Sequence, residues 1–221
     1  MNTTTQEPDK SNITLHLTQV LVPYELAAGK LRIHDAYDWH QRVWQAFGGR
    51  DGQTRDFLVR VDRKEENYRV IILSQSLPTK PDWCPTDCFG TKIIRDDFFD
   101  KKTYRFSLLA NPTKKIRVDN ADGTRKKNGR RVPLTKRDDL VSWIERKAST
   151  GGFTLNPDSL RTIPRGREYF RKAGASGTLT AVEFQGELTI KDPTQFRKAF
   201  VKGIGPAKGF GFGLLALAPI S

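Results

Sequence analysis

The three histidines of the chain, His16, His34 and His40, are its candidates for proton transfer, because histidine titrates near neutral pH. His16 lies in an alternating segment typical of a strand, where a structural role is favoured. His34 lies in a loop, and the sequence suggests no partner for it. His40 follows Tyr37 by three residues on a helical pattern, so both side chains can converge on one substrate group. From spacing alone, the ordinary interpretation is that Tyr37 packs in the core and His40 is a partly exposed helix residue.

Acidic and sulfur ligands for a metal are scattered along the chain. The paired carboxylates Asp96–Asp97 and Asp138–Asp139 have the positions of turns or helix starts, which argues against a two-metal nuclease. Cys84 and Cys88 stand four residues apart, and a zinc site would need two further ligands that no nearby histidine provides. We therefore expect reduced cysteines, no metal and no cofactor.

Near the C-terminal end, residues 202–213 hold five glycines and two lysines, with Phe210 and Phe212 among them. Glycine permits positive φ and a close approach by another backbone, and exposed backbone N–H groups can bind anions. This segment can therefore lie along a phosphodiester backbone, although plain turns also use glycine. Its candidate binding residues are Lys202, Gly203, Gly205, Lys208 and Gly209.

The net charge of +13 belongs to one half of the chain. Residues 1–100 carry 13 basic and 15 acidic side chains, whereas residues 101–221 carry 25 basic and 10 acidic ones. Such a one-sided excess is typical of a polyanion-binding protein, the alternative being a merely soluble basic protein. The basic side chains form two clusters: Lys114, Lys115, Arg117, Arg125, Lys126, Lys127, Arg130 and Arg131; then Arg161, Arg165, Arg167, Arg171 and Lys172.

The elements that position these residues follow from hydrophobic periodicity. In the first half, the patterns predict a strand over 13–22, a helix over 36–47 capped by Asp35, and strands over 57–61 and 68–73. In the second half, they predict strands over 103–110, 161–172, 178–190 and 214–217, with helices beginning at Asp138/Asp139 and at Asp192. Each half approximates a ferredoxin-like unit.

The economical interpretation is an α+β fold of two tandem ferredoxin-like domains. We expect a flexible leader over 1–12, a first domain over 13–89 and a second over 90–221, which carries the basic loop, the basic hairpin and the glycine-rich loop. No apolar run is long enough to span a bilayer, and the N-terminus lacks an apolar signal core. These features predict a cytoplasmic protein without a membrane partner.

Four stretches, in order over about four-fifths of the chain, carry a family resemblance: Tyr37–His40; Leu109–Lys114; Gly129–Val132 with Trp143–Lys147 and Gly151–Phe153; and Val182–Gly186 with Gly203–Leu215. Together they resemble the RAMP superfamily of CRISPR RNA-binding proteins and, more narrowly, the CasE family of repeat-cleaving endoribonucleases in the type I-E Cascade complex. The chain departs from the family in a longer insert, Asp119–Asn128, within its basic loop.

The resemblance implies metal-independent cleavage of pre-crRNA at the base of the repeat stem, by attack of a 2′-hydroxyl. The products would be a 2′,3′-cyclic phosphate and a 5′-hydroxyl, with the crRNA retained. His40 would act as general acid or base and Tyr37 would position the ribose or share proton transfer. The family places a lysine near the end of a hairpin arm, which implies Lys172, or else Arg171, as the cation that stabilises the transition state.

The partners implied are the stem-loop of the CRISPR repeat and other Cascade subunits, including the backbone protein at the crRNA 3′ end. Two other functions stay open: a non-catalytic crRNA-binding RAMP subunit, and a ribosome-associated or DNA-binding structural protein. The predicted RNA-binding residues are Lys114, Lys115, Arg117, Lys126, Lys127, Arg130, Arg131, Arg161, Arg165, Arg167, Arg171, Lys202, Gly203, Gly205, Lys208 and Gly209.

Overall fold

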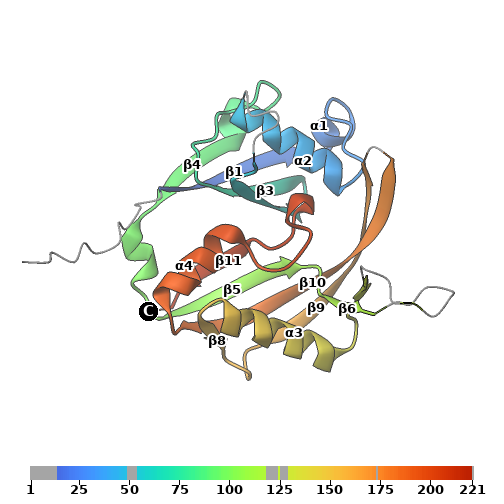
Figure 1. Cartoon of the computed structure of the whole chain (residues 1–221). Coiled ribbons are helices and arrows are strands. Elements are labelled where there is room, and N and C mark those ends of the chain that lie inside the picture. The colour runs from blue at the N-terminus through green and yellow to red at the C-terminus, as the bar shows by residue number, and fades with distance from the viewer. Residues whose placement is uncertain (1–13, 49–53, 118–123, 125–128, 173, 221) are drawn as a thin grey trace, which may run out of the picture.

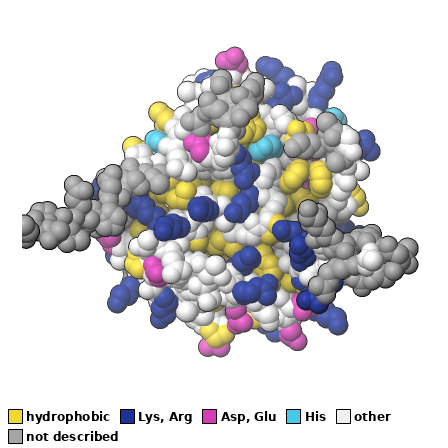
Figure 2. Space-filling view, viewed as in Figure 1, with side chains coloured by type: hydrophobic (Ala, Val, Ile, Leu, Met, Phe, Trp, Pro, Cys, Tyr) yellow, Lys and Arg dark blue, Asp and Glu magenta, His cyan; other side chains and the backbone are white. Residues whose placement is uncertain are grey.

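A computed structural model of the chain describes residues 14–48, 54–117, 124, 129–172 and 174–220. The predicted leader over 1–12 and the basic residues Arg125, Lys126 and Lys127 lie outside this part of the chain. Two antiparallel sheets, each with its own helices, form the two halves of the molecule (Figure 1). In a space-filling view of the same face, Lys and Arg side chains gather across the middle, between the two halves (Figure 2).

The first sheet has the strand order β2-β3-β1-β4, in which every neighbouring pair is antiparallel. Its helix α2 follows β1 and precedes β2, so the order of elements and strands is that of a ferredoxin-like unit. A short 3₁₀ turn, η2, takes the place of the second helix. The elements are β1 (Leu15–Pro23), α1 (Tyr24–Ala28), α2 (Ala36–Trp44), η1 (Gln45–Phe47), β2 (Phe57–Arg63), β3 (Asn67–Ser74), η2 (Thr86–Cys88) and β4 (Phe89–Ile94).

The second sheet repeats this arrangement with the strand order β11-β5-β10-β8. A long strand, β9, extends it by pairing with β10, and β6 pairs with β7 in a separate hairpin between β5 and α3. The elements are η3 (Asp96–Phe99), β5 (Thr103–Ala110), β6 (Thr113–Ile116), β7 (Arg130–Pro133), α3 (Arg137–Thr150), β8 (Phe153–Leu155), β9 (Arg161–Lys172), β10 (Ala175–Ile190), α4 (Pro193–Lys202), η4 (Lys208–Phe210) and β11 (Leu215–Pro219). The predicted fold class of two tandem ferredoxin-like units is confirmed.

Four strands were not expected from the sequence, and two of them, β6 and β7, form a hairpin within the predicted basic loop. Phe89–Ile94 pairs with β1 and completes the first sheet, although it begins where the sequence places the boundary between domains. Phe153–Leu155 pairs with β10 at the end of the strand order and serves as the second strand of the ferredoxin-like unit in chain order, so β9 is an additional strand. The division of the chain at residue 89 stays a prediction.

Two aspartates begin the helices that the sequence assigns to them. The side chain of Asp35 accepts hydrogen bonds from the backbone N–H groups of Tyr37 and Asp38. The carboxylate of Asp38 in turn accepts one from the backbone N–H of Asp35, which completes a capping box. Asp192 accepts from the N–H of Gln195 ahead of a proline in the first turn of α4. Both caps were predicted, and both are confirmed.

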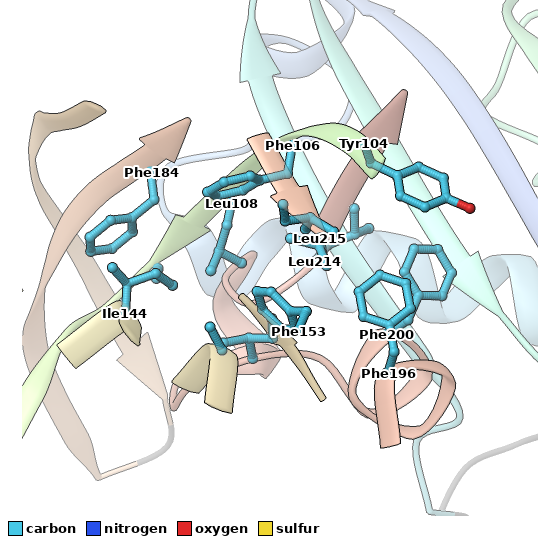
Figure 3. Close-up of a cluster of buried hydrophobic side chains, with 14 of the residues drawn as sticks. Tyr104, Phe106, Leu108, Ile144, Phe153, Phe184, Phe196, Phe200, Leu214 and Leu215 are labelled. Atoms are coloured by element: carbon cyan, nitrogen blue, oxygen red, sulfur yellow. The ribbon is translucent and has the colours of Figure 1, made fainter. Parts of the chain in front are cut away.

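Apolar side chains from the second sheet, α3 and α4 form the larger core (Figure 3). Phe184 stacks on Trp143 of α3 with ring centroids 5.7 Å apart, and Phe196 of α4 meets Phe153 edge-on at 5.6 Å. Leu58 from β2 belongs to the same cluster. The opposite face of the first sheet packs on α2 in a smaller core. The two halves therefore share buried apolar surface.

A buried ionic network also joins the halves. Arg60 on β2 donates to Glu183 on β10 at 2.9 Å and to Ser107 on β5 at 2.7 Å, and both charged side chains are less than a tenth exposed. Arg60 also pairs with Asp62 at 2.7 Å. Burial by itself would raise the pKa of Glu183, but hydrogen bonds from Ser107, Gln185, Arg165 and Arg60 lower it to about 2.

Replacing Glu183 by glutamine is expected to lower the free energy of unfolding at pH 7 by about 1.5–3 kcal/mol, because buried Arg60 keeps Asp62 but loses its charged hydrogen bond to Glu183. Acid should reduce the difference in unfolding free energy between wild type and Glu183→Gln. The pKa of Glu183 in the folded protein lies below the ordinary 4.5, so its stabilising effect is present above pH 4.5 and is lost as the pH falls toward 2. Urea denaturation of both proteins at pH 7 and pH 3 measures this. Glu145→Gln, on the exposed face of α3, is the control, and an equal deficit at both pH values would contradict the network's role.

Candidate active site and nucleic-acid interface

Helix α2 brings Tyr37 and His40 together. The two rings are half-buried, and their centroids are 6.3 Å apart. The capping box at Asp35 sets where the helix begins, so it also sets the direction in which the two side chains project. That both side chains converge on one substrate group stays a prediction.

A hydrogen bond from Trp44 engages His40. Nε1–H of Trp44, one turn later on α2, donates to Nε2 of His40 at 3.0 Å. An indole N–H can only donate, so Nε2 is the acceptor of this bond. Proton transfer through Nε2 therefore requires this bond to open. Phe57 lies on another side of the imidazole, with ring centroids 5.9 Å apart.

The tip of the β9–β10 hairpin docks on the start of α2 (Figure 1). The backbone N–H of Arg171 donates to Oδ2 of Asp35 at 2.8 Å. Phe170, beside it, packs on Phe210 of the glycine-rich loop with centroids 4.4 Å apart, and Phe210 in turn lies 6.4 Å from Tyr37. Three segments far apart in the sequence thus meet around Tyr37.

Lys172, the residue predicted to stabilise the transition state, is the last residue of β9. The hydrogen bond of Arg171 places this end of the strand beside the start of α2. The side-chain position of Lys172 lies outside what the structure describes. Its assignment, and the choice between it and Arg171, stay predictions.

The glycine-rich loop runs between the two halves, and packing accounts for some of its glycines. Gly203 has φ +73°, and a Cβ built on it would lie 2.8 Å from both Cδ atoms of Leu58. A Cβ on Gly205 would lie 3.0 Å from the indole of Trp143. A Cβ on Gly209, in contrast, would meet Nη1 of Arg55 at 3.3 Å and Cε1 of His40 at 4.0 Å. Gly209 is therefore the glycine of the loop that borders the histidine.

A β-bulge separates the predicted arginines of β9. The register between β9 and β10 shifts where Gly166 faces Ala181 and Pro164 faces Val182, which leaves Arg165 between the two pairs. Arg165 turns to Glu183, to which its Nε donates at 2.8 Å and its Nη2 donates a second bond. Its guanidinium thus belongs to the ionic network, although the side chain is 52% exposed. Three further arginines are exposed along the strand: Arg161, Arg167 and Arg171.

The β6–β7 hairpin carries the described part of the first basic cluster. In its register, Lys115 faces Arg131 and Ile116 faces Arg130. Every one of the described basic side chains of this cluster is exposed: Lys114, Lys115, Arg117, Arg130 and Arg131. Such a surface has the charge to contact phosphates.

A groove of about 570 Å³ lies between α3, α4 and the glycine-rich loop. Its charged lining residues are all cations: Arg131, Lys147, Lys198, Lys202 and Lys208. Lys147 and Lys198 were not predicted as binding residues, because each sits in an ordinary helical pattern.

Lys208 and Arg55 are half-buried cations of this region. Burial lowers the pKa of the Arg55 guanidinium. Burial also lowers the pKa of Lys208, and the nearby positive charges of Arg55, Lys147 and Lys202 lower it further. Arg55 was not predicted as a site residue, since no motif or charge cluster surrounds it.

The described ranges contain neither a cluster of metal ligands nor a helix able to span a membrane. No group of three or more His, Cys, Asp or Glu side chains in these ranges has the arrangement of a metal site. None of the helices in the same ranges combines the length and the apolarity needed to cross a membrane.

Comparison with known proteins gives consistent matches over nearly the whole chain. The family model described as "CRISPR associated protein" matches residues 15–219. The CRISPR system Cascade subunit CasE of Escherichia coli K12 is 33% identical over 191 residues, which cover 84% of this chain and 93% of that protein. The CRISPR-associated endoribonuclease Cse3 of Thermus thermophilus is 27% identical over 220 residues, which cover 92% of this chain and 99% of that protein.

Solved structures show the same relationship. The crystal structure of Cas6e from E. coli K-12 superposes with a TM-score of 0.69 at 28% identity, covering 93% of this chain and 100% of that one. T. thermophilus Cse3, bound to an RNA representing a pre-cleavage complex, superposes with a TM-score of 0.71 at 25% identity over the same shares.

Proposed function

The chain belongs to the family of CRISPR-associated proteins, and from this premise we propose that it is the endoribonuclease subunit of a Cascade complex. It binds the stem-loop of the CRISPR repeat and cleaves the precursor RNA at the base of the stem. The relative from T. thermophilus is named an endoribonuclease, and its structure with a pre-cleavage RNA supports the same activity here. The observation that carries the proposal is the meeting of α2, the hairpin tip and the glycine-rich loop around Tyr37 and His40.

In the proposed reaction the ribose 2′-oxygen attacks the adjacent phosphorus while the bond to the 5′-oxygen breaks. The 2′-hydroxyl loses its proton and the 5′-oxygen gains one, so the products are a 2′,3′-cyclic phosphate and a 5′-hydroxyl. His40 takes part in one of these transfers as general acid or base, and Tyr37 positions the ribose. Lys172, or Arg171, supplies positive charge to the phosphorane. These roles need no metal ion.

RNA binding is proposed for the exposed cations around this centre. The β6–β7 hairpin, the exposed arginines of β9 and the all-cation groove have the charge to hold phosphates of a stem, whose shape would be recognised more than its base sequence. The cut removes only the strand downstream of the stem, so the contacts to the stem persist in the product. Persisting contacts slow release, and we propose that the protein keeps its crRNA and joins other Cascade subunits in the cytoplasm.

The function is tested by incubating the protein with the repeat transcript of its own host in EDTA and mapping the product ends. Cleavage at the base of the stem, with a 2′,3′-cyclic phosphate and a 5′-hydroxyl, is the expected result. Binding without cleavage would instead indicate a non-catalytic crRNA-binding subunit. Equal retention of DNA and RNA, without preference for a hairpin, would indicate a structural nucleic-acid-binding protein.

Arg167→Gln is expected to weaken repeat-RNA binding and to lower the slope of log K against log salt by about 0.7–0.9, the loss of one phosphate contact. Arg165→Gln removes the same charge two residues earlier, but its guanidinium is engaged with Glu183, so we expect an unchanged slope and reduced stability. Filter binding over a salt series measures the slopes, and urea denaturation measures stability. Equal slope changes in the two variants would contradict this division of roles.

A further inference from the structure

Arg55 lies beside His40 although it is 15 residues later in the chain. The residue after it, Asp56, is anchored to the segment that follows β3: its Oδ2 accepts from the backbone N–H of Ser76 at 3.1 Å and from the hydroxyl of Ser76 at 2.6 Å. The Arg55 guanidinium is 5.9 Å from the centroid of the Phe57 ring, and that ring is also 5.9 Å from the His40 ring. The position of Arg55 is therefore set by the hydrogen-bonded backbone at Asp56 and by the Phe57 ring, which lies near both Arg55 and His40.

Gly209 lies between the two side chains. A Cβ built on this glycine would be 3.3 Å from Nη1 of Arg55 and 4.0 Å from Cε1 of His40, so those atoms can be no farther apart than the two distances together. One phosphoryl group fits such a span, since each hydrogen bond takes about 2.8 Å. A side chain in place of Gly209 would enter this space.

Among the described residues, the positive charges of Arg55 and Lys208 have no carboxylate as an ion-pair partner. Within those ranges, no carboxylate forms an ion pair with Arg55 or with Lys208, and the positive charge of Arg55 lowers the pKa of Lys208. Half-buried like charges without an anion are unfavourable in the free protein. A bound phosphate would relieve this repulsion, so the arrangement favours an anion at this place.

We propose that Arg55 is a catalytic residue that donates a hydrogen bond to a non-bridging oxygen of the scissile phosphate. This inference rests on the proposed function. As the 2′-oxygen bonds to phosphorus and the 5′-oxygen leaves, negative charge grows on the non-bridging oxygens, and a guanidinium already in place stabilises it. Arg55 keeps its proton throughout, and the proton transfers belong to His40 and its partner group. Arg55 thus acts beside the cation expected at the hairpin tip.

The test compares Arg55→Gln and Arg55→Lys with wild type, using single-turnover cleavage of repeat RNA in EDTA and binding of an uncleavable repeat that is 2′-deoxy at the cut. Arg55→Gln should lower the cleavage rate about 10²–10³-fold, and its Kd should change by less than about threefold. Arg55→Lys should retain an intermediate rate, because it keeps the charge. A third variant, Arg55→Ala, removes the side chain, and added guanidinium ion should restore part of its cleavage rate.

Arg95→Gln is the matched control, because Arg95 is an exposed arginine that pairs with Asp97 at 3.3 Å on the surface. It should cleave at the wild-type rate. An Arg55→Gln protein as fast as an active wild type would overturn the inference and leave the proposed function intact. If Arg55→Gln lost affinity by the same factor as rate, or lost thermal stability, and guanidinium did not rescue Arg55→Ala, the inference would also be overturned. An inactive wild type would instead overturn the proposed function, and the inference with it.

Discussion

Replacing His40 by alanine is expected to slow cleavage of repeat RNA by about 10²–10⁴-fold, the usual contribution of one general acid or base. Affinity for the RNA should change by no more than a few-fold, because binding rests on the many exposed cations. Single-turnover rates at saturating protein, with Kd measured on uncleavable RNA, separate the two effects. The expected outcome is a protein that binds its substrate and leaves it intact.

Two variants make this experiment specific to proton transfer. His40→Gln retains an acceptor for the indole N–H of Trp44, which donates to His40 at 3.0 Å, so it preserves packing while removing the titratable group. It should be as slow as His40→Ala. His34→Ala removes an exposed histidine just before α2 and should cleave at the wild-type rate. Wild-type cleavage by His40→Ala would exclude His40 from the chemistry.

The fold was largely predictable because its helices and most of its strands have regular apolar periods. Asp35 and Asp192 marked helix starts that the structure confirms. The strands that were missed lack such a signal. β4 is an edge strand whose middle residues are all exposed, and β8 has only three residues, so neither shows an alternation that a sequence could reveal.

The candidate site was predictable only where its residues are close in sequence. Tyr37 and His40 lie on one helix, so their spacing predicts their proximity. Arg55 approaches His40 through the packing of Phe57 and Gly209, which no local pattern records. Strand spacing likewise places Arg165 and Arg167 on one face, but the bulge turns Arg165 toward Glu183. Tertiary contacts and backbone irregularities decide these positions.

A single 2′-deoxy nucleotide at the cleavage site is expected to block the reaction entirely. The proposed mechanism has no water nucleophile: the new bond to phosphorus comes from the 2′-oxygen, and without that oxygen the 5′-oxygen cannot be displaced. Binding should be nearly unchanged, since one lost hydroxyl removes at most a hydrogen bond of about 1 kcal/mol. Cleavage and filter-binding assays on the same oligonucleotide measure both effects.

The matched control carries its 2′-deoxy nucleotide one residue farther upstream than the nucleotide that supplies the nucleophile, so the lost hydroxyl takes no part in bond formation. It should be cleaved at nearly the wild-type rate, with the same product ends. Cleavage of the test RNA at the original bond would contradict the mechanism, because another nucleophile would then have to attack phosphorus. The products would identify it: attack by water leaves an end without a cyclic phosphate. In that case the nucleophile that His40 assists would be a water molecule and not the 2′-hydroxyl.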